Sequence, residues 1–253
     1  MRFSMVDIDN NEYIFDDSAF RILDRGLSIE LDVIEKSFSP GADFPGIQRD
    51  ESSKLEFIYD FNKPIENDFR SSLNELIRQS RKTVIIRDNV NQLETEAILE
   101  SVDIKYDDGG FNLGSQNTFS FKQLTPYWRD IDYIIVSESD ITSGVVIIDN
   151  NGYIDTPPII TILAQEPIPK IAIRINETKR GILINDLEFG LVGLETYIID
   201  NKAGYAELNQ INRNQKIKNG TGFFDLRVGV NTILIEMTGM AEVEIKYKRR
   251  YYL

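Results

Sequence analysis

Carboxylates are the most abundant side chains in this sequence that could do acid–base chemistry. The chain has 41 Asp and Glu residues but no His and no Cys. This composition removes Ser-His-Asp triads, HExxH zinc sites, thiol nucleophiles, thiolate metal sites and disulfides. Two carboxylates can still hydrolyse a glycosidic bond, one as the acid and the other as nucleophile or base. An acid-pair glycosidase is therefore one hypothesis, although so many acids also form pairs by chance.

Aromatic side chains bear on a second hypothesis, a non-catalytic carbohydrate-binding β-sandwich module. Sugars stack on flat apolar rings, and the chain has 11 Tyr and 14 Phe but a single Trp, Trp128. Phe119 and Phe121 alternate with polar residues, which favours core packing for these rings. We rank the sugar-binding module above the glycosidase, and we expect that the protein is not an enzyme.

Two acidic segments contain the residue types that bind calcium. Residues 149–155 read DNNGYID, but aligning their glycine with that of an EF-hand loop leaves Ile147 and Pro158 at the first and last ligand positions. Residues 7–11 read DIDNN and are followed by Glu12, where the loop glycine belongs. We therefore predict turns at both places and no metal site.

A phosphate-binding loop is also missing from the sequence. Gly109-Gly110 has neither the spacing of a dinucleotide-binding fingerprint nor a helix after it, so it predicts a hairpin turn. We accordingly expect no cofactor.

The chain ends in a cluster of cations that contrasts with its acidic composition. Lys and Arg total 28, which gives a formal net charge of −13. Near the C-terminus, however, stand Lys246, Lys248, Arg249 and Arg250. One interpretation is a solvated final strand; the other is a strand whose cations meet acids of the first domain or of an adjacent subunit. The overall acidity argues against stable nucleic-acid binding.

Most of the segments that must position these residues have the pattern of strands. Apolar and polar residues alternate in short segments, and turns rich in Gly, Asn and Pro separate them. In the first half these segments are residues 27–34, 55–61, 84–87, 97–106 and 117–124. In the second half they are residues 145–148, 159–163, 171–175, 181–184, 194–199, 206–208, 222–226, 231–237 and 241–247. The sequence predicts a mainly β fold that ends in a β-sandwich.

Only one stretch has the spacing of a helix. After Pro64, apolar residues recur three or four positions apart to about Gln79, namely Ile65, Phe69, Leu73, Leu76 and Ile77. This spacing predicts an amphipathic helix at about 64–80 that packs its apolar side on the sheet of the first domain.

A polar segment without strong periodicity, residues 137–143, predicts the boundary between two domains. We expect an N-terminal domain over 1–136 and a C-terminal domain over 137–253. The N-terminus is too acidic for a signal peptide, and no stretch approaches the roughly 18 apolar residues of a membrane span. We expect a protein made and kept in a cytoplasm, with no membrane partner.

The order of these features resembles one family, the distal tail proteins of long-tailed, non-contractile bacteriophages and of prophages in Gram-positive hosts. In the first half the resemblance is carried by FSPGADFPG at residues 38–46, the helix before the TVII strand at 83–86, and FSF at 119–121 leading into TPYW at 125–128. In the second half it is carried by NG at 151–152, TPPII at 156–160, GVNTI at 229–233 and VEIKYKRRY at 243–251.

This resemblance implies a structural protein at the tip of the virion tail, assembled in the cytoplasm of the host bacterium. Family members form a homohexameric ring from a β-barrel-like first domain with one α-helix, and a galectin-like β-sandwich projects outward. The ring joins the major tail tube protein to the tail-associated tip protein and often anchors receptor-binding proteins. DNA passes through its lumen without being bound. The chain has no room for an inserted carbohydrate-binding module, which favours a plain hub.

Overall fold

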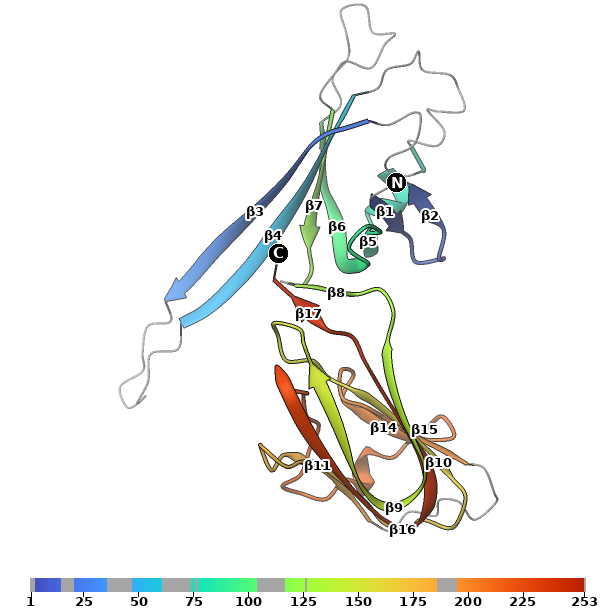
Figure 1. The fold of residues 1–253 in the computed structure, drawn as a ribbon. Helices are drawn as coiled ribbons and strands as arrows, with labels where there is room; N and C mark the ends of the chain where they lie inside the picture. Colours follow the sequence, from blue (N-terminus) through green and yellow to red (C-terminus); the bar gives the residue numbers. More distant parts are fainter. Residues whose placement is uncertain are drawn as a thin grey trace, which may run out of the picture. The chain divides into compact units, whose positions relative to one another are not determined.

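The computed structural model describes residues 3–14, 21–35, 47–60, 74–75, 77–103, 117–125, 127–185 and 195–252. The chain divides into two compact units, residues 1–131 together with Leu253, and residues 132–252. Both units consist mainly of antiparallel strands, which confirms the predicted fold class (Figure 1). Among the described residues, no helix is long and apolar enough to cross a bilayer.

The first unit is built on one antiparallel sheet. Its strands lie in the order β2-β1-β5-β6-β7-β4-β3, and β8 pairs with β6. The strands are β1 (Phe3–Val6), β2 (Glu12–Ile14), β3 (Arg21–Glu35), β4 (Ile47–Asp60), β5 (Val84–Asp88), β6 (Leu93–Asp103), β7 (Asn117–Gln123) and β8 (Trp128–Asp130).

The burial of β5 and β7 shows why these sequences form a sheet. Val84 and Ile86 of β5 are buried, whereas the residue between them is only partly buried. In β7, Phe119 and Phe121 are both buried. Side chains two residues apart lie on one face of a strand, so the apolar residues leave water together. The strands predicted for residues 84–87 and 117–124 are thereby confirmed.

The predicted helix is present where the structure describes it. Residues 74–75 and 77–80 are helical. Its last residue, Ser80, is buried and donates a hydrogen bond of 3.1 Å to Sδ of Met5 in β1. This contact holds the last turn of the helix against the sheet. Four residues of the predicted apolar stripe lie outside the described residues: Ile65, Phe69, Leu73 and Leu76.

Strands β3 and β4 form a hairpin that extends beyond the rest of the sheet. Their register runs from Arg21 opposite Asp60 to Glu35 opposite Ile47. Strand β4 pairs with β7 only from Lys54 to Tyr59. Among the described residues, 29–35 and 47–53 therefore pair only with each other, and we call this two-stranded segment the arm (Figure 1).

The second unit contains an antiparallel sheet of eight strands. Its strands follow the order β12-β11-β16-β10-β13-β14-β15, and β9 pairs with β16. The elements are β9 (Ile134–Asn150), β10 (Ile159–Ala164), β11 (Ile171–Ile175), β12 (Gly181–Ile184), β13 (Thr196–Asp200), β14 (Tyr205–Leu208), β15 (Ile211–Asn212), a 3-10 helix η1 (Asn214–Lys216), β16 (Gly229–Tyr247) and β17 (Arg250–Tyr251).

Strand β16 folds this sheet into two layers. Its first half, up to Met237, pairs with β11, its second half, from Ala241, pairs with β10, and β9 follows both halves on the other side. The register between β9 and β16 shifts after Glu236, so the corner lies around Gly239. A strand that crosses between layers at a bulge makes such a corner. One continuous apolar core receives side chains from both halves of β16 and from their partner strands.

Two segments differ from the predicted strand pattern. Residues 137–143, expected to lack strand structure, lie within β9, where most of their side chains are exposed; the two compact units meet in the chain between residues 131 and 132. The strand expected at residues 222–226 is absent, and only Leu226 forms a bridge, to Thr156. Here the backbone bonds elsewhere: the Phe224 N–H donates to Oδ1 of Asn201.

Candidate assembly surface

Lys246 lies on the outer face of the sandwich, near the end of β16. Val243, Ile245 and Tyr247, on the opposite face of the same strand, are buried in the core. The Lys246 ammonium lies 2.7 Å from the carboxylate of Glu244, and both side chains are partly exposed. The alternation predicted for this strand is confirmed. The acid that Lys246 meets belongs to its own strand, and such an exposed pair contributes about 0–1 kcal/mol.

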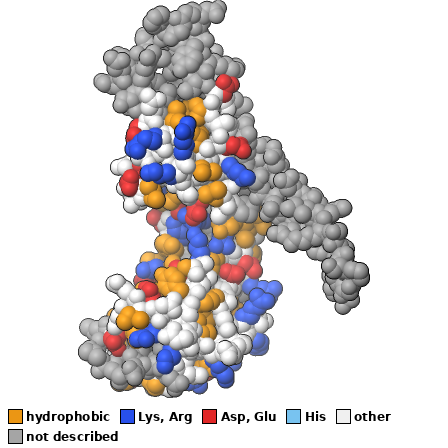
Figure 2. Space-filling view, turned by 180° about the vertical axis from the view of Figure 1, so that it is seen from behind, with side chains coloured by type: hydrophobic (Ala, Val, Ile, Leu, Met, Phe, Trp, Pro, Cys, Tyr) orange, Lys and Arg blue, Asp and Glu red, His pale blue; other side chains and the backbone are white. Residues whose placement is uncertain are grey.

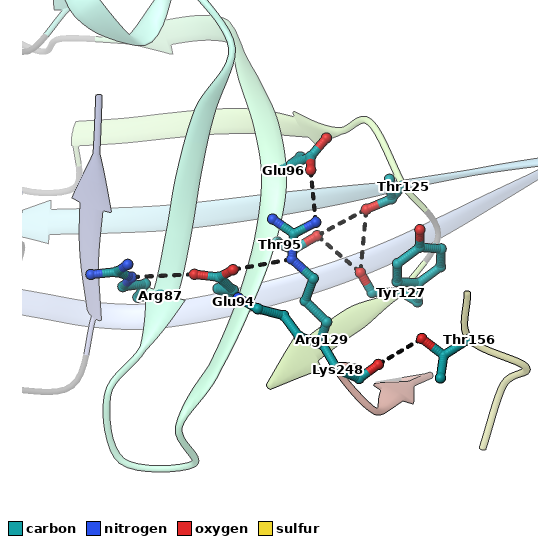
Figure 3. Close-up of polar contacts among 9 residues, drawn as sticks. All are labelled: Arg87, Glu94, Thr95, Glu96, Thr125, Tyr127, Arg129, Thr156 and Lys248. Carbon is teal, nitrogen blue, oxygen red and sulfur yellow. Dashed lines mark hydrogen bonds and ion pairs between the residues drawn. The ribbon is translucent and has the colours of Figure 1, made fainter. Parts of the chain in front are cut away.

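Lys248 is fixed by its backbone as well as by its side chain. Its carbonyl accepts a hydrogen bond of 2.7 Å from the Thr156 hydroxyl, which Figure 3 shows. Its ammonium lies 4.8 Å from the ring centroid of Tyr133, within the range of a cation–π interaction. The side chain therefore lies over an aromatic face of the same unit.

Arg249 and Arg250 lie beside two further tyrosines, Tyr251 and Tyr153. The Arg249 guanidinium is 5.9 Å from the Tyr251 centroid, and Tyr251 meets Tyr153 edge-to-face, also at 5.9 Å. Arg250 donates to the Asp155 carbonyl at 3.2 Å, and its own carbonyl accepts from the Tyr153 N–H at 2.8 Å.

We call this group the cation–tyrosine cluster: Lys248, Arg249, Arg250, Tyr133, Tyr153 and Tyr251. Tyr133 and Tyr153 are 47% and 70% exposed. Because tyrosine and arginine are enriched where protein partners bind, the cluster is a candidate contact surface. Sequence reasoning found its cations but missed Tyr133 and Tyr153, which are distant in the chain and lie in no motif.

A second charged group lies in the first unit, and no sequence pattern indicated it. Figure 3 shows Arg129 of β8 reaching two acids of β6. Its Nε is 3.1 Å from Glu94, whose side chain is 3% exposed, and its Nη1 is 2.8 Å from Glu96. Arg87 of β5 approaches Glu94 from the other side, at 3.4 Å. These pairs tie β8 and β5 to β6.

The environment of Arg129 shifts its pKa. Burial alone would lower the pKa of this guanidinium, but the carboxylates of Glu94 and Glu96 outweigh burial and raise it. The group is therefore a permanent cation held between acids. Such a cluster fixes the position of β8 on β6.

The acidic segments weighed as calcium sites are turns. Oδ1 of Asp7 accepts the N–H groups of Asp9 and Asn11, at 2.9 and 2.8 Å. Oδ1 of Asn150 accepts the Gly152 N–H at 3.2 Å. In the described part of the chain, no three acids gather as a metal site would require.

The ring best suited to sugar stacking is not accessible. Trp128 is 2% exposed in the core of the first unit.

The other sites weighed from the sequence are a glycine turn and a nucleic-acid surface. Gly109-Gly110 lies outside the described residues. Figure 2 shows one face of the molecule, on which Lys and Arg side chains are interspersed with acidic and apolar ones. The described residues on this face therefore form no single basic stripe of the kind that nucleic-acid binding uses.

Comparison with known proteins gives one family match. Residues 151–251 match the family described as siphovirus-type tail component, C-terminal domain. No curated protein sequence matches the chain. The match covers β10 to β17, the strands that carry the sandwich and all four C-terminal cations.

Solved structures resemble the chain over almost its full length. The Dit protein of SPP1, described as a paradigm of the hub adsorption apparatus in phages that infect Gram-positive hosts, is 15% identical with a TM-score of 0.66, and the match covers 98% of this chain and 99% of that one. Two structures of the phage p2 baseplate in its activated conformation, with Ca and with Sr, are 13% identical with TM-scores of 0.50 and 0.51, and each match covers 98% and 97% of the two chains. At these identities the likeness is one of fold.

Proposed function

We propose that the chain, whose residues 151–251 match the siphovirus-type tail component family, is the distal tail hub of a long, non-contractile phage tail. The observation that carries this proposal is the family match in the second unit together with the fold that both units share with SPP1 Dit. In this role the protein is a structural component of the tail tip and not an enzyme.

We propose a homohexameric ring formed by the first unit. The arm supports this assembly, because a hairpin of two strands is marginally stable in water without a further strand or a covering layer. Among the described residues, β3 pairs only with β4 along its whole length. An open strand edge of this length is an aggregation risk in a monomer and a contact surface in a ring.

The charge of the chain suits a ring through which DNA passes. With a net charge of −13, an acidic lumen would repel phosphates and would not slow ejection through phosphate contacts. We propose the major tail tube protein and the tail-associated tip protein as the axial partners of the ring. Receptor-binding proteins are the partners proposed for the outward-facing second unit.

The cation–tyrosine cluster is our candidate for a contact with acids of a neighbouring subunit or tail protein. Each exposed ion pair contributes about 0–1 kcal/mol, so one substitution should do little. Several cations that lose water together at an interface can instead set the geometry of two subunits.

Size-exclusion chromatography with light scattering tests the ring. We expect a species of six times the chain mass, either for the free protein at high concentration or for the protein in assembled tails. The variant K248Q/R249Q/R250Q should lower ring yield more than it lowers the melting temperature, because it loses side-chain contacts within the unit but keeps the backbone bonds of Lys248 and Arg250. K216Q/K218Q removes cations elsewhere on the same unit and should assemble normally. A protein that is monomeric both in solution and in tails would refute the proposal.

A further inference from the structure

The second unit carries a hollow on its outer surface, away from the cation–tyrosine cluster. It has a volume of about 310 Å³ and is lined mainly by β11, β12 and the residues beside them. Ala172 and Leu183 form part of its wall, and they alternate with Ile171, Ile173 and Ile184 of the buried core. The hollow is therefore a surface feature on the reverse side of the core, and its size reaches the lower end of small-molecule sites.

The lining of the hollow is cationic although the protein is acidic. Lys170, Arg174 and Lys179 line it, and Glu236 is its only acid. Arg174 lies 3.4 Å from Glu236, so these two charges offset each other. Among the described residues, neither Lys170 nor Lys179 forms an ion pair. Two positive charges thus stand beside an apolar wall, and the one on Lys179 is near enough to Glu177 to help lower the pKa of that carboxyl.

The hairpin between β11 and β12 holds Lys179 at the hollow. Lys179 has φ +58°, a left-handed conformation in which side chains other than Gly and Asn are uncommon. Its N–H donates to the Ile175 carbonyl at 2.9 Å, and its ammonium donates to Oδ1 of Asn176, also at 2.9 Å. These two hydrogen bonds fix the turn and keep the Lys179 side chain beside the hollow.

Glu177, the acidic residue of the same turn, is hydrogen-bonded to the backbone of β16. Both carboxylate oxygens of Glu177 accept the Thr232 N–H, at 3.1 Å. These hydrogen bonds lower the pKa of the Glu177 carboxyl and hold it on β16. The carboxylate is therefore occupied and does not line the hollow.

We propose that this hollow binds a small organic anion, a phosphate or carboxylate group attached to a carbon body. Lys170 and Lys179 would contact the anionic group, and Ala172 and Leu183 would contact the carbon body. A charged head beside an apolar wall suits such a ligand, because ion contacts give orientation and apolar contact adds affinity. The site goes beyond the hub role, and a hub whose hollow binds nothing would still be a hub.

Titration of the full chain, followed by the amide signals of Ala172, Gly181 and Leu183, tests this site. The probes are glycerol 3-phosphate, glucuronate, inorganic phosphate and glycerol. We expect saturable shifts with glycerol 3-phosphate or glucuronate, and the better of these two identifies the anionic group. The variant K170A/K179A should bind that probe about tenfold more weakly or worse. R180A removes a neighbouring cation that does not line the hollow and should bind like the parent.

Each other outcome counts against the site. If neither glycerol 3-phosphate nor glucuronate gives saturable shifts, the site is overturned. It is also overturned if K170A/K179A melts like the parent and binds the probe as tightly as the parent does. Inorganic phosphate that bound as tightly as glycerol 3-phosphate would overturn the role of the apolar wall. Glycerol that bound equally well would overturn the role of charge.

Discussion

Arg129 and Glu94 form an ion pair at 3.1 Å in which the side chains are only 16% and 3% exposed. A charge so well shielded from water depends on its partner, because the surviving group of a broken pair stays buried without compensation. The pair joins β8 to β6 directly beside the backbone bridge between the same two residues. The position of β8 is therefore set by both the ion pair and the strand pairing with β6.

We expect Arg129→Ala to destabilise the first unit by about 3 kcal/mol, the lower end for breaking a buried pair, because Arg87 still approaches Glu94. Denaturant unfolding of the parent and the variant measures this loss. The double variant R129A/E94Q should recover part of it, since the buried charge is gone. Arg78→Ala is the control: its pair with Glu75 is exposed, and its removal should leave the unfolding midpoint almost unchanged. Equal midpoints for R129A and R78A would contradict the assignment.

Acid should selectively weaken the turn between β1 and β2. Burial raises the pKa of the Asp7 carboxyl, but hydrogen bonds from Asn11, Asp9 and Tyr13 lower it more, so the pKa lies below its ordinary 3.8. The stabilisation is present above the unfolded-state pKa and disappears as the pH falls through the lower folded-state pKa.

Asp7→Asn should thus melt below the parent at pH 7, and the difference should shrink as the pH falls below about 4. Melting curves across that range, together with an NMR titration of the Asp7 carboxyl, give both quantities. A difference that stays constant down to the acid limit would show that the charge of Asp7 is not what stabilises the turn.

The corner of β16 should not tolerate a side chain at residue 239. A Cβ on Gly239 would come within 2.4 Å of the Pro167 carbonyl oxygen, and a backbone atom cannot rotate away. We expect Gly239→Ala to cost about 1–3 kcal/mol, the range for overpacking. At Gly222, where an added Cβ would meet nothing within 4 Å, the same change should be nearly neutral. The melting temperatures of the two variants are compared with that of the parent. If G239A melts like the parent, the corner of β16 can relax around the added side chain.

The sequence predicted most strands of the sandwich but not how they are joined. Alternation in residues 231–237 and 241–247 predicted two separate strands. The structure has one strand, β16, because Gly239 permits a close approach to Pro167 at the corner. Such an approach depends on a segment far away in the chain, and local periodicity cannot report it.

The candidate surface was predictable only in part, for a similar reason. Four C-terminal cations stand out in an acidic chain, and their alternation with apolar residues fixed which face they occupy. Tyr133 and Tyr153 reach them through strand pairing and a bridge between Ile154 and Arg250. Glu94 and Glu96 look like solvated residues of an exposed strand until β8 brings Arg129 against them.

Hydrogen exchange of β3 should distinguish the isolated chain from the assembled ring. In an antiparallel pair, alternate N–H groups of an edge strand point away from the partner strand. Among the described residues β3 pairs only with β4, so these outward amides of residues 21–35 should exchange quickly in a monomer. A neighbouring subunit that adds a strand or a covering layer at this edge would protect them.

Mass spectrometry of exchange in the free protein and in assembled tails makes the comparison. Peptides from β10, a strand paired on both sides by β13 and β16, serve as the control and should be protected in both states. We expect protection of β3 to rise on assembly while that of β10 stays constant. The arm, residues 29–35 and 47–53, should show the larger gain, because no third strand covers it within the described chain. Unchanged exchange in β3 would place the subunit contact elsewhere on the first unit.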